Sequence, residues 1–405
     1  MKLYSIIFII LFYIYSIYGG DEIKFPSLTS TASSLSSGVD IERPILKFPK
    51  DRPFKIVQFT DLHYEGLFSG EDLLTQQGQE KILEIENPDF VMLSGDMISG
   101  YKSAFVNEEA YKKTWDLFTE PMRKRNIPWA ITFGNHDAEG ALTGYQMMEL
   151  DRSYPLSLSQ HGPSEAAGNA NYVINIQGSN DTAAASYIYI FDSDTPSCGA
   201  NGAWGCIQPS QIEWFKKQSL LNLQIPSIAF VHVPPIEVVD LWNNFPVYGD
   251  FGDMESSCFY THKYKFVDSL LEQGDIKGLY FGHDHKNDFI GDYKGLSMGY
   301  GRKTGYGSYN PKYQQGARVL LIDENPYLIT SYIRNNLGEI DQQKLHLPDN
   351  QLKAPLHCSK PGDGENEDWQ MYLVVFVIVS VFVMFVQYRR TNKKYMPINR
   401  PAEMA

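Results

Sequence analysis

Short apolar runs rich in β-branched and aromatic residues recur along the chain, and each stops where a polar loop begins. They cover residues 54–60, 90–94, 129–133, 228–231 and 278–281. Runs of this length and composition predict buried strands. Longer stretches between them have the pattern of helices, at residues 73–86, 108–125, 211–221 and 264–273, with Gly274 as a stop signal. Strands that alternate with helices predict a layered α/β domain, which we place at residues 51–346.

A much longer apolar segment lies near the other end of the chain, at residues 369–388, and its interior carries no charge. At about 1.5 Å per residue, a helix of this length reaches roughly the 30 Å of a bilayer core. Acidic residues precede the segment and basic residues follow it, which predicts one transmembrane helix and a cytosolic tail at residues 389–405. A buried pair of strands is the alternative, and these flanks disfavour it. Residues 347–368 would form a juxtamembrane stalk.

The first residues have the basic start, apolar middle and small-residue end of a signal peptide. We expect cleavage near Gly19, so that residues 1–19 are removed. An uncleaved anchor is the alternative, because bulky Ile17 or Tyr18 would occupy the third position before the cut. Residues 20–50 include a Ser/Thr-rich stretch and predict a flexible linker. The two ends together predict a single-pass type I membrane protein at the cell surface or an endosomal or lysosomal membrane, with its folded domain lumenal or extracellular.

The four cysteines allow three disulfide pairings in an oxidising compartment. Pairing of Cys198 with Cys206 is our first choice, because a short Gly-containing loop joins them. A bridge between Cys258 and Cys358 and free thiols remain open. Asn180 begins an Asn-Asp-Thr sequon between two strand-like runs, which predicts a glycosylated loop.

Five short motifs of metal-binding residue types follow the predicted strands. They are Asp61-Leu62-His63, Gly95-Asp96, Gly134-Asn135-His136-Asp137, Val231-His232 and Gly282-His283-Asp284-His285. Ligand sites of layered α/β sheets form at the carboxyl ends of strands, where these motifs lie. One such motif recurs by chance as a turn or a cap, but five of them disfavour that structural explanation. Carboxylate, amide and imidazole groups suit Fe, Mn or Zn, so the set predicts a site for two metal ions.

The order of these motifs resembles that of the calcineurin-like metallophosphoesterase superfamily, over about residues 54–332. The local sequence at residues 54–63 and 282–289 is similar to its purple-acid-phosphatase-related branch of plants and fungi. The resemblance implies an α/β fold with a central β-sandwich flanked by helices, to which the predicted transmembrane helix would be added.

The resemblance also implies a role for each motif residue. One metal ion would be held by Asp61, His63, Asp96 and His285, and the other by Asp96, Asn135, His232 and His283. Asp96 would bridge the two ions, which would be divalent or mixed-valence. His136 would lie beside the substrate, where it could protonate the leaving oxygen or stabilise charge on the phosphoryl group. A histidine that only caps its loop is the alternative.

Two positions depart from true purple acid phosphatases. Those enzymes have a tyrosine ligand three residues after the Gly-Asp aspartate and a glycine at the end of the first motif, where this chain has Ser99 and His63. The resemblance therefore implies that His63 replaces the tyrosinate and that the purple charge-transfer colour is absent. Arg302 could contact phosphate oxygens, but we favour a solvated loop arginine.

The resemblance implies a dimetal phosphatase that hydrolyses phosphate monoesters through attack of a metal-bridging hydroxide. Its substrate would be a phosphorylated small molecule or protein. The formal net charge of -13 provides no basic footprint, so we expect no nucleic-acid partner. A phosphodiesterase acting on nucleotides or lipid headgroups is one alternative, and a non-catalytic membrane-bound binding protein is another. In the predicted tail, the sequence from Tyr395 to Ile398 has the form that sorting adaptors read, which makes such an adaptor a candidate partner.

Overall fold

The structure, a computed structural model, describes residues 42–66, 69–193, 204–252 and 265–350. The predicted signal peptide, transmembrane segment, cytosolic tail and sorting motif lie outside these ranges, as do Cys198, Cys258 and Cys358. These features stay predictions. None of the helices in the described ranges is both long enough and apolar enough to cross a membrane.

The described strands form two mixed sheets, of which the first has six strands in the order β14-β13-β12-β2-β3-β4. Its strands are β2 (Phe54–Phe59), β3 (Phe90–Ser94), β4 (Trp129–Thr132), β12 (Gly316–Asp323), β13 (Leu328–Asn335) and β14 (Ile340–Asp341). β2, β3 and β4 run parallel, whereas β12 joins β2 and β13 in antiparallel fashion. The carboxyl ends of the three parallel strands therefore meet at one edge of this sheet.

The second sheet has nine strands in the order β1-β5-β6-β7-β9-β11-β10-β8-β15. Its strands are β1 (Leu46–Lys47), β5 (Tyr172–Gln177), β6 (Ala184–Ile190), β7 (Ser227–Phe230), β8 (Val247–Tyr248), β9 (Ile276–Phe281), β10 (Ile290–Tyr293), β11 (Leu296–Tyr300) and β15 (Leu345–His346). The neighbouring strands β6, β7, β9 and β11 run parallel at its centre. β1 pairs with β5, so the last part of the predicted linker contributes a strand to this sheet.

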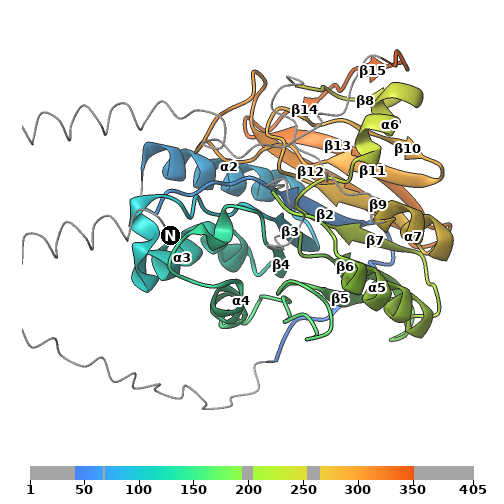
Figure 1. Cartoon of the computed structure of the whole chain (residues 1–405), viewed down its shortest axis with the longest axis horizontal. Helices are drawn as coiled ribbons and strands as arrows, with labels where there is room; N and C mark the ends of the chain where they lie inside the picture. The colour runs from blue at the N-terminus through green and yellow to red at the C-terminus, as the bar shows by residue number, and fades with distance from the viewer. Residues whose placement is uncertain (1–41, 67–68, 194–203, 253–264, 351–405) are drawn as a thin grey trace, which may run out of the picture. The chain divides into compact units, whose positions relative to one another are not determined.

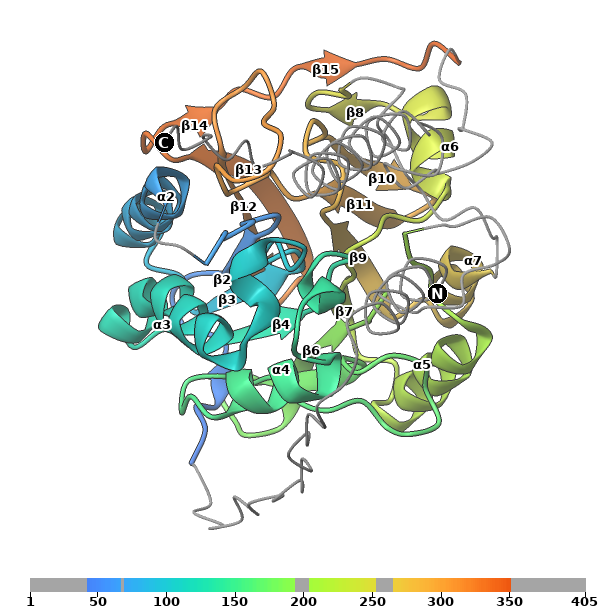
Figure 2. The same cartoon turned by 60° about the vertical axis from the view of Figure 1, so that its left-hand side comes forward.

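Helices cover the outer sides of the two sheets (Figures 1 and 2). They are α2 (Gly70–Glu86), α3 (Glu108–Arg125), α4 (Gly144–Arg152), α5 (Pro209–Leu221), α6 (Glu237–Asn244) and α7 (Phe266–Gln273), together with the short 3-10 turns Ser103–Val106 and Asp137–Glu139. α2 packs against strands of the six-stranded sheet, whereas α6 and α7 pack against strands of the nine-stranded sheet. α2 begins where Ser69 accepts a hydrogen bond from the Asp72 amide. α7 ends at Gly274, whose φ of 74° is a conformation that glycine adopts without strain.

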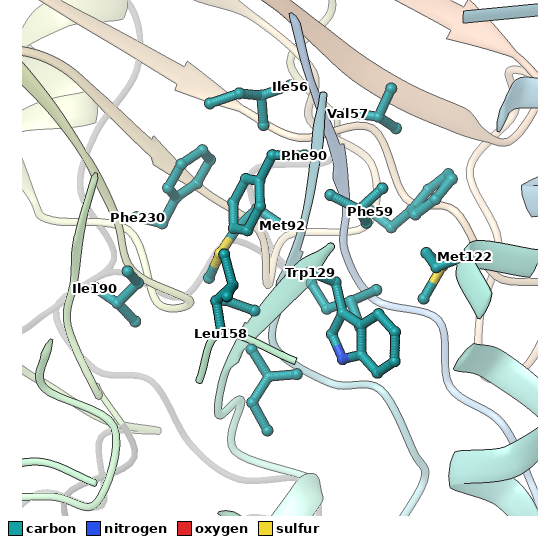
Figure 3. Close-up of a cluster of buried hydrophobic side chains, with 14 of the residues drawn as sticks. Ile56, Val57, Phe59, Phe90, Met92, Met122, Trp129, Leu158, Ile190 and Phe230 are labelled. Atoms are coloured by element: carbon teal, nitrogen blue, oxygen red, sulfur yellow. The ribbon is translucent and has the colours of Figure 1, made fainter. Parts of the chain in front are cut away.

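The two sheets share a hydrophobic core (Figure 3). Phe90 and Met92 of β3 lie toward Phe230 of the opposite sheet, where all three side chains are fully buried. Alternate residues of β2 lie on the other face, where Phe59 lies near Met122 of α3. A sheet buried on both faces explains why these strands read as continuous apolar runs.

The layered α/β architecture predicted from the sequence is confirmed. The five apolar runs form β2, β3, β4, β7 and β9, and the four helical stretches form α2, α3, α5 and α7, with ends that differ by a few residues. Each predicted motif follows the strand that was expected to present it. The strand order then places both parallel groups, and with them all five motifs, in a position to share one site.

Candidate metal centre

The backbone turns sharply where the motifs leave the sheets. Asp61, His63, Asp96 and His283 all have positive φ, at 52°, 49°, 49° and 74° respectively. Residues other than glycine rarely adopt this left-handed region, and such strained positions cluster at functional sites. Four of the seven predicted metal ligands therefore have a backbone that the surrounding fold must hold in place.

Two motif glycines allow side chains of the site to approach the backbone closely. A Cβ atom at Gly95 would lie 2.3 Å from Nδ1 of His232, and a Cβ atom at Gly134 would lie 2.2 Å from Oδ1 of Asp96. Neither distance leaves room for a methyl group, so any side chain at these positions would displace a predicted ligand. The glycines of Gly-Asp and Gly-Asn-His-Asp are thus part of the site's geometry.

One cluster of buried side chains brings together Asp61, His63, Asp96 and His285, with candidate ligand atoms within 4.8 Å of one another. The Nε2 atoms of His63 and His285 are 2.9 Å apart. Nε2 of His63 is 3.5 Å from Oδ2 of Asp96, and Nε2 of His285 is 3.5 Å from Oδ1 of Asp61. These atoms converge on one point, as the ligands of a single cation would.

A second cluster joins Asp96 to His232 and His283, so Asp96 belongs to both. Nε2 of His232 lies 3.3 Å from Oδ2 of Asp96. Nε2 of His232 and Oδ1 of Asn135 are both buried and have no hydrogen-bond partner among the described residues. Buried polar atoms are normally paired, so Nε2 of His232, which faces the shared Asp96 carboxylate, and the unpaired Oδ1 of Asn135 fit a second cation.

In three of the clustered histidines, Nδ1 contacts a residue that is not itself in the clusters. Nδ1 of His232 donates to the Ser94 carbonyl at 2.8 Å, and Nδ1 of His285 donates to the Tyr309 carbonyl at 2.9 Å. Nδ1 of His63 lies 3.1 Å from Oγ of Ser99. A carbonyl can only accept, so Nε2 of His232 and of His285 is left to offer an electron pair toward the clusters. Such outer hydrogen bonds orient metal-binding histidines in proteins.

Most of the clustered histidines favour the neutral form that binds metals. Burial lowers the pKa of His63 well below its usual range, and burial together with His232 lowers the pKa of His283 to about 3. Burial likewise lowers the pKa of His285. Burial also opposes a proton on His232, but the Asp96 carboxylate outweighs it and raises the pKa of His232 to about 10. The same negative charge favours a cation at that nitrogen, so proton and metal would compete there.

His136 lies at the edge of the clusters rather than within them. Its backbone amide donates to Oδ1 of Asp96 at 2.9 Å, and its Nδ1 lies 2.6 Å from Oε2 of Glu139. Its side chain is 21% exposed, whereas the side chain of His63 is fully buried. Burial lowers the pKa of His136, but the charge of Asp96 and the hydrogen bond with Glu139 outweigh burial and leave the pKa raised. The structure thus places His136 at the edge of the clusters, partly exposed and held by Glu139.

A family model described as calcineurin-like phosphoesterase matches residues 54–287, which is more than half of the chain. The chain belongs to the calcineurin-like phosphoesterase family. The match covers all five motifs, and it confirms the superfamily predicted from them.

Similar proteins place this phosphoesterase in the predicted branch. The chain is 30% identical over 319 residues to a protein of Arabidopsis thaliana named probable inactive purple acid phosphatase 29, covering 70% of this chain and 80% of that protein. It is 28% identical over 280 residues to phosphatase DCR2 of Saccharomyces cerevisiae, covering 62% of this chain and 47% of that protein. Among solved structures, a dimetal phosphatase from Danio rerio aligns with a TM-score of 0.47 at 12% identity, covering 74% of this chain and 100% of that one.

Asp137 has a structural role that was not predicted from the sequence. Its Oδ2 accepts from the amides of Asp96 and Gly134, at 3.0 and 2.8 Å, and its Oδ1 accepts from the Ile98 amide at 3.1 Å. This carboxylate joins the loops after β3 and β4. In the sequence, only its place in the Gly-Asn-His-Asp motif pointed to Asp137. Its three backbone partners can be identified only in the folded chain.

Two basic residues beside the site behave differently from the prediction. The expectation that Arg302 is a solvated loop residue is wrong, because its side chain is only 1% exposed and is paired with the carboxylates of Asp288 and Asp341. The next residue, Lys303, is also buried, and its Nζ donates to the backbone carbonyl of Asp61 at 3.1 Å. Burial lowers the pKa of Lys303 to about 7. This hydrogen bond from Lys303 therefore helps to fix the loop that carries the first motif. The sequence analysis did not predict this role.

The predicted modification sites fall partly outside the described residues. Cys206 is disulfide-bonded, and its partner lies outside the described residues, so the pairing with Cys198 stays a prediction. Asn180 is exposed in the connection between β5 and β6. Its glycosylation also stays a prediction.

Proposed function

We propose that this chain is a two-metal phosphatase that hydrolyses phosphate monoesters. The observation that carries the proposal is the pair of clusters that share Asp96, with buried Nε2 of His232 and Oδ1 of Asn135 lacking hydrogen-bond partners among the described residues. Six of the seven ligands predicted from the motifs belong to these clusters, and the seventh, Asn135, is buried next to His136, whose amide donates to Asp96. Such a set is suited to Fe, Mn or Zn.

When bound, two cations would supply positive charge to the phosphoryl oxygens and a nucleophile that is ionised at neutral pH. The chain's own residues do the rest. Asp61, Asp96 and Asn135 would position the cations, and Gly95 and Gly134 leave room for the side chains of His232 and Asp96. His136 would donate a proton to the leaving oxygen, because Glu139 holds its Nδ1 and leaves its Nε2 as the group able to face the substrate.

The preference for monoesters over diesters rests on the names of similar proteins. The fold alone does not decide it, because one fold in this family serves several reactions. The relatives that support it carry the names phosphatase and purple acid phosphatase. Phosphodiester hydrolysis uses the same metals and is the first alternative. A non-catalytic binding protein is the second, and the word inactive in the name of the Arabidopsis relative favours it. The complete donor set favours an enzyme.

We also propose that the enzyme domain lies on the lumenal or extracellular side of a membrane. The sequence supports this through the predicted signal peptide and the apolar segment at residues 369–388. The disulfide at Cys206 adds support, because such bonds persist in oxidising compartments. Protease protection of the domain in sealed microsomes, together with digestion of the tail, is the expected result. Digestion of the domain in intact microsomes would reverse the proposed topology.

A substrate panel tests the reaction class. The purified chain is stripped with chelator, reloaded separately with Zn, Mn or Fe, and assayed against matched phosphate monoesters and diesters. We expect faster monoester hydrolysis in at least one metal form, and a loss of several orders of magnitude in Asp96→Asn. Asp116→Asn is the matched control, because Asp116 is exposed on α3 and should leave the rate unchanged.

The outcomes separate the three candidate functions. Faster diester hydrolysis would favour the phosphodiesterase. Tight metal binding without turnover of either class would favour the binding protein. Near-normal turnover in a folded Asp96→Asn protein would contradict the two-metal assignment itself.

A further inference from the structure

Two aromatic side chains lie against His136, at the edge of the metal clusters. The ring of Tyr101 lies 5.1 Å from that of His136, and the ring of Trp204 lies 5.5 Å from it on a different loop. Trp204 also meets His283, at 6.1 Å between ring centroids. Tyr101 follows β3 and Trp204 precedes α5, so two segments distant in the sequence contribute rings to one histidine.

Both rings meet His136 at an angle. Tyr101 and His136 meet at 66° between ring planes, and Trp204 and His136 meet at 59°. By contrast, Tyr309 stacks nearly flat on His285, at 24° and 4.0 Å, and covers a candidate ligand.

Tyr101 is 49% exposed, although it adjoins a buried polar centre. Isolated exposed aromatics are ordinary, but two rings on one histidine at a candidate active site are a specific arrangement. The charges next to them are already compensated. Lys102 is paired with Glu65 at 2.6 Å, and His136 is paired with Glu139 at 2.6 Å. The paired charges beside the two rings favour an uncharged group against them rather than a second phosphate.

We propose that Tyr101 and Trp204 form a binding clamp for a planar ring in the alcohol part of the substrate. This inference rests on the proposed function, which places the phosphoryl group at the metal clusters and the leaving oxygen at His136. Whatever the leaving oxygen carries must then lie beyond His136, against the two rings. The substrate class is a phosphate monoester whose organic part has an aromatic ring close to the ester oxygen. Aromatic rings recognise one another through stacked and edge contacts as well as through buried area.

Three phosphonates that cannot be hydrolysed measure this recognition separately from turnover. They are 2-phenylethylphosphonate, 2-cyclohexylethylphosphonate and ethylphosphonate, titrated by calorimetry into the metal-loaded full chain. All three present the same anionic group, so differences in Kd report on the organic part. We expect the phenyl compound to bind about tenfold more tightly than the ethyl compound, and about threefold more tightly than the cyclohexyl compound.

Substitutions assign the preference to the clamp. Tyr101→Ala and Trp204→Ala should each reduce the phenyl-over-ethyl preference to within about twofold, with little change in Kd for ethylphosphonate. Trp204→Phe keeps an aromatic ring and should retain most of the phenyl-over-ethyl preference. This variant distinguishes loss of the ring in Trp204→Ala from a folding defect. Tyr145→Ala is the matched control, because Tyr145 is 58% exposed and stacks on His161 of the α4 region. It should leave all three affinities unchanged.

The inference and the proposed function fail in different ways. Equal Kd values for the phenyl and ethyl compounds, or an unchanged preference in Tyr101→Ala and Trp204→Ala, would overturn the clamp. Equal binding of phenyl and cyclohexyl compounds would show a general apolar site and would overturn recognition of a planar ring. A clear ring preference in a chain that hydrolyses no phosphate ester would leave the clamp standing and refute the phosphatase.

Discussion

Removal of the Ser99 hydroxyl should weaken one of the two proposed metal sites and spare the other. Oγ of Ser99 lies 3.1 Å from Nδ1 of His63, and both residues are fully buried. In Ser99→Ala, the His63 ring loses the described side-chain contact that fixes its orientation, and its Nδ1 is left without that hydrogen bond. Ser99 stands where true purple acid phosphatases have a tyrosine ligand. In this chain the residue at that position would act on the metal indirectly, through its contact with His63.

Two independent magnitudes agree on the size of this effect. Loss of an outer hydrogen bond to a metal-binding histidine typically lowers metal affinity about 10- to 100-fold. That range equals about 1.4–2.8 kcal/mol, and leaving a buried polar group unpaired costs about 1–3 kcal/mol. We therefore expect one site of Ser99→Ala to bind Zn about 10- to 100-fold more weakly, while the site of His232 and His283 changes less than threefold.

Calorimetric titration of Zn into the metal-free chain, with a competing chelator, resolves the two affinities. Ser186→Ala is the matched control, because Oγ of the buried Ser186 in β6 makes a hydrogen bond of the same 3.1 Å to the hydroxyl of the half-buried Tyr327, in the turn between β12 and β13. The control should lose about 1 kcal/mol of folding stability and keep both metal affinities. Equal weakening of both sites in Ser99→Ala, or none in either, would refute the reasoning.

Three further predictions concern the loops, the proton donor and the fold. Gly134→Ala should abolish binding of at least one metal ion by equilibrium dialysis while circular dichroism stays native, because its Cβ would lie 2.2 Å from Oδ1 of Asp96; normal metal content would contradict this. His136→Ala should lower turnover about 100- to 10,000-fold with both metals retained, and least for esters with good leaving groups; equal losses across leaving groups would indicate a positioning role. Burial raises the pKa of Glu86, but hydrogen bonds led by that from Tyr332 outweigh it and lower the pKa below its usual 4.5. The ionised carboxylate therefore stabilises the fold above pH 4.5, and this stabilisation is lost as the pH falls. Glu86→Gln should lower the free energy of unfolding in urea by about 2 kcal/mol at pH 7 and by clearly less at pH 3. An equal loss at both pH values would refute the assignment.

Sequence reasoning found the parts of the site that depend on local pattern. The buried strands β2, β3 and β4 are continuous apolar runs, and Asp61 and Asp96 follow two of them directly, so the strand ends could be read from the chain. Parallel pairing then brings those ends together, which is a general property of such sheets. Six of the seven candidate ligands lie in the two clusters, whereas no cluster distance places Asn135.

The supporting residues could not be predicted, because their partners are distant in the sequence. Ser99 reaches His63 across 36 positions, and Lys303 reaches Asp61 across 242. Arg302 looked like a solvated loop residue because neither of its partners is adjacent, yet it is paired with Asp288 and Asp341, 14 and 39 positions away. A buried charge must be paired, and only the folded chain shows with what.

The dependence of phosphate monoester hydrolysis on bound metal tests the two-metal phosphatase proposal most directly. The metal-free chain is titrated with Zn or Mn, and metal content and turnover are measured on the same samples. We expect turnover to stay near background up to one equivalent, to rise between one and two, and to level off at two ions per chain, with Asp96→Asn inactive throughout. Turnover that survives complete removal of metal, or two tightly bound ions with no turnover of any monoester, would contradict the proposal.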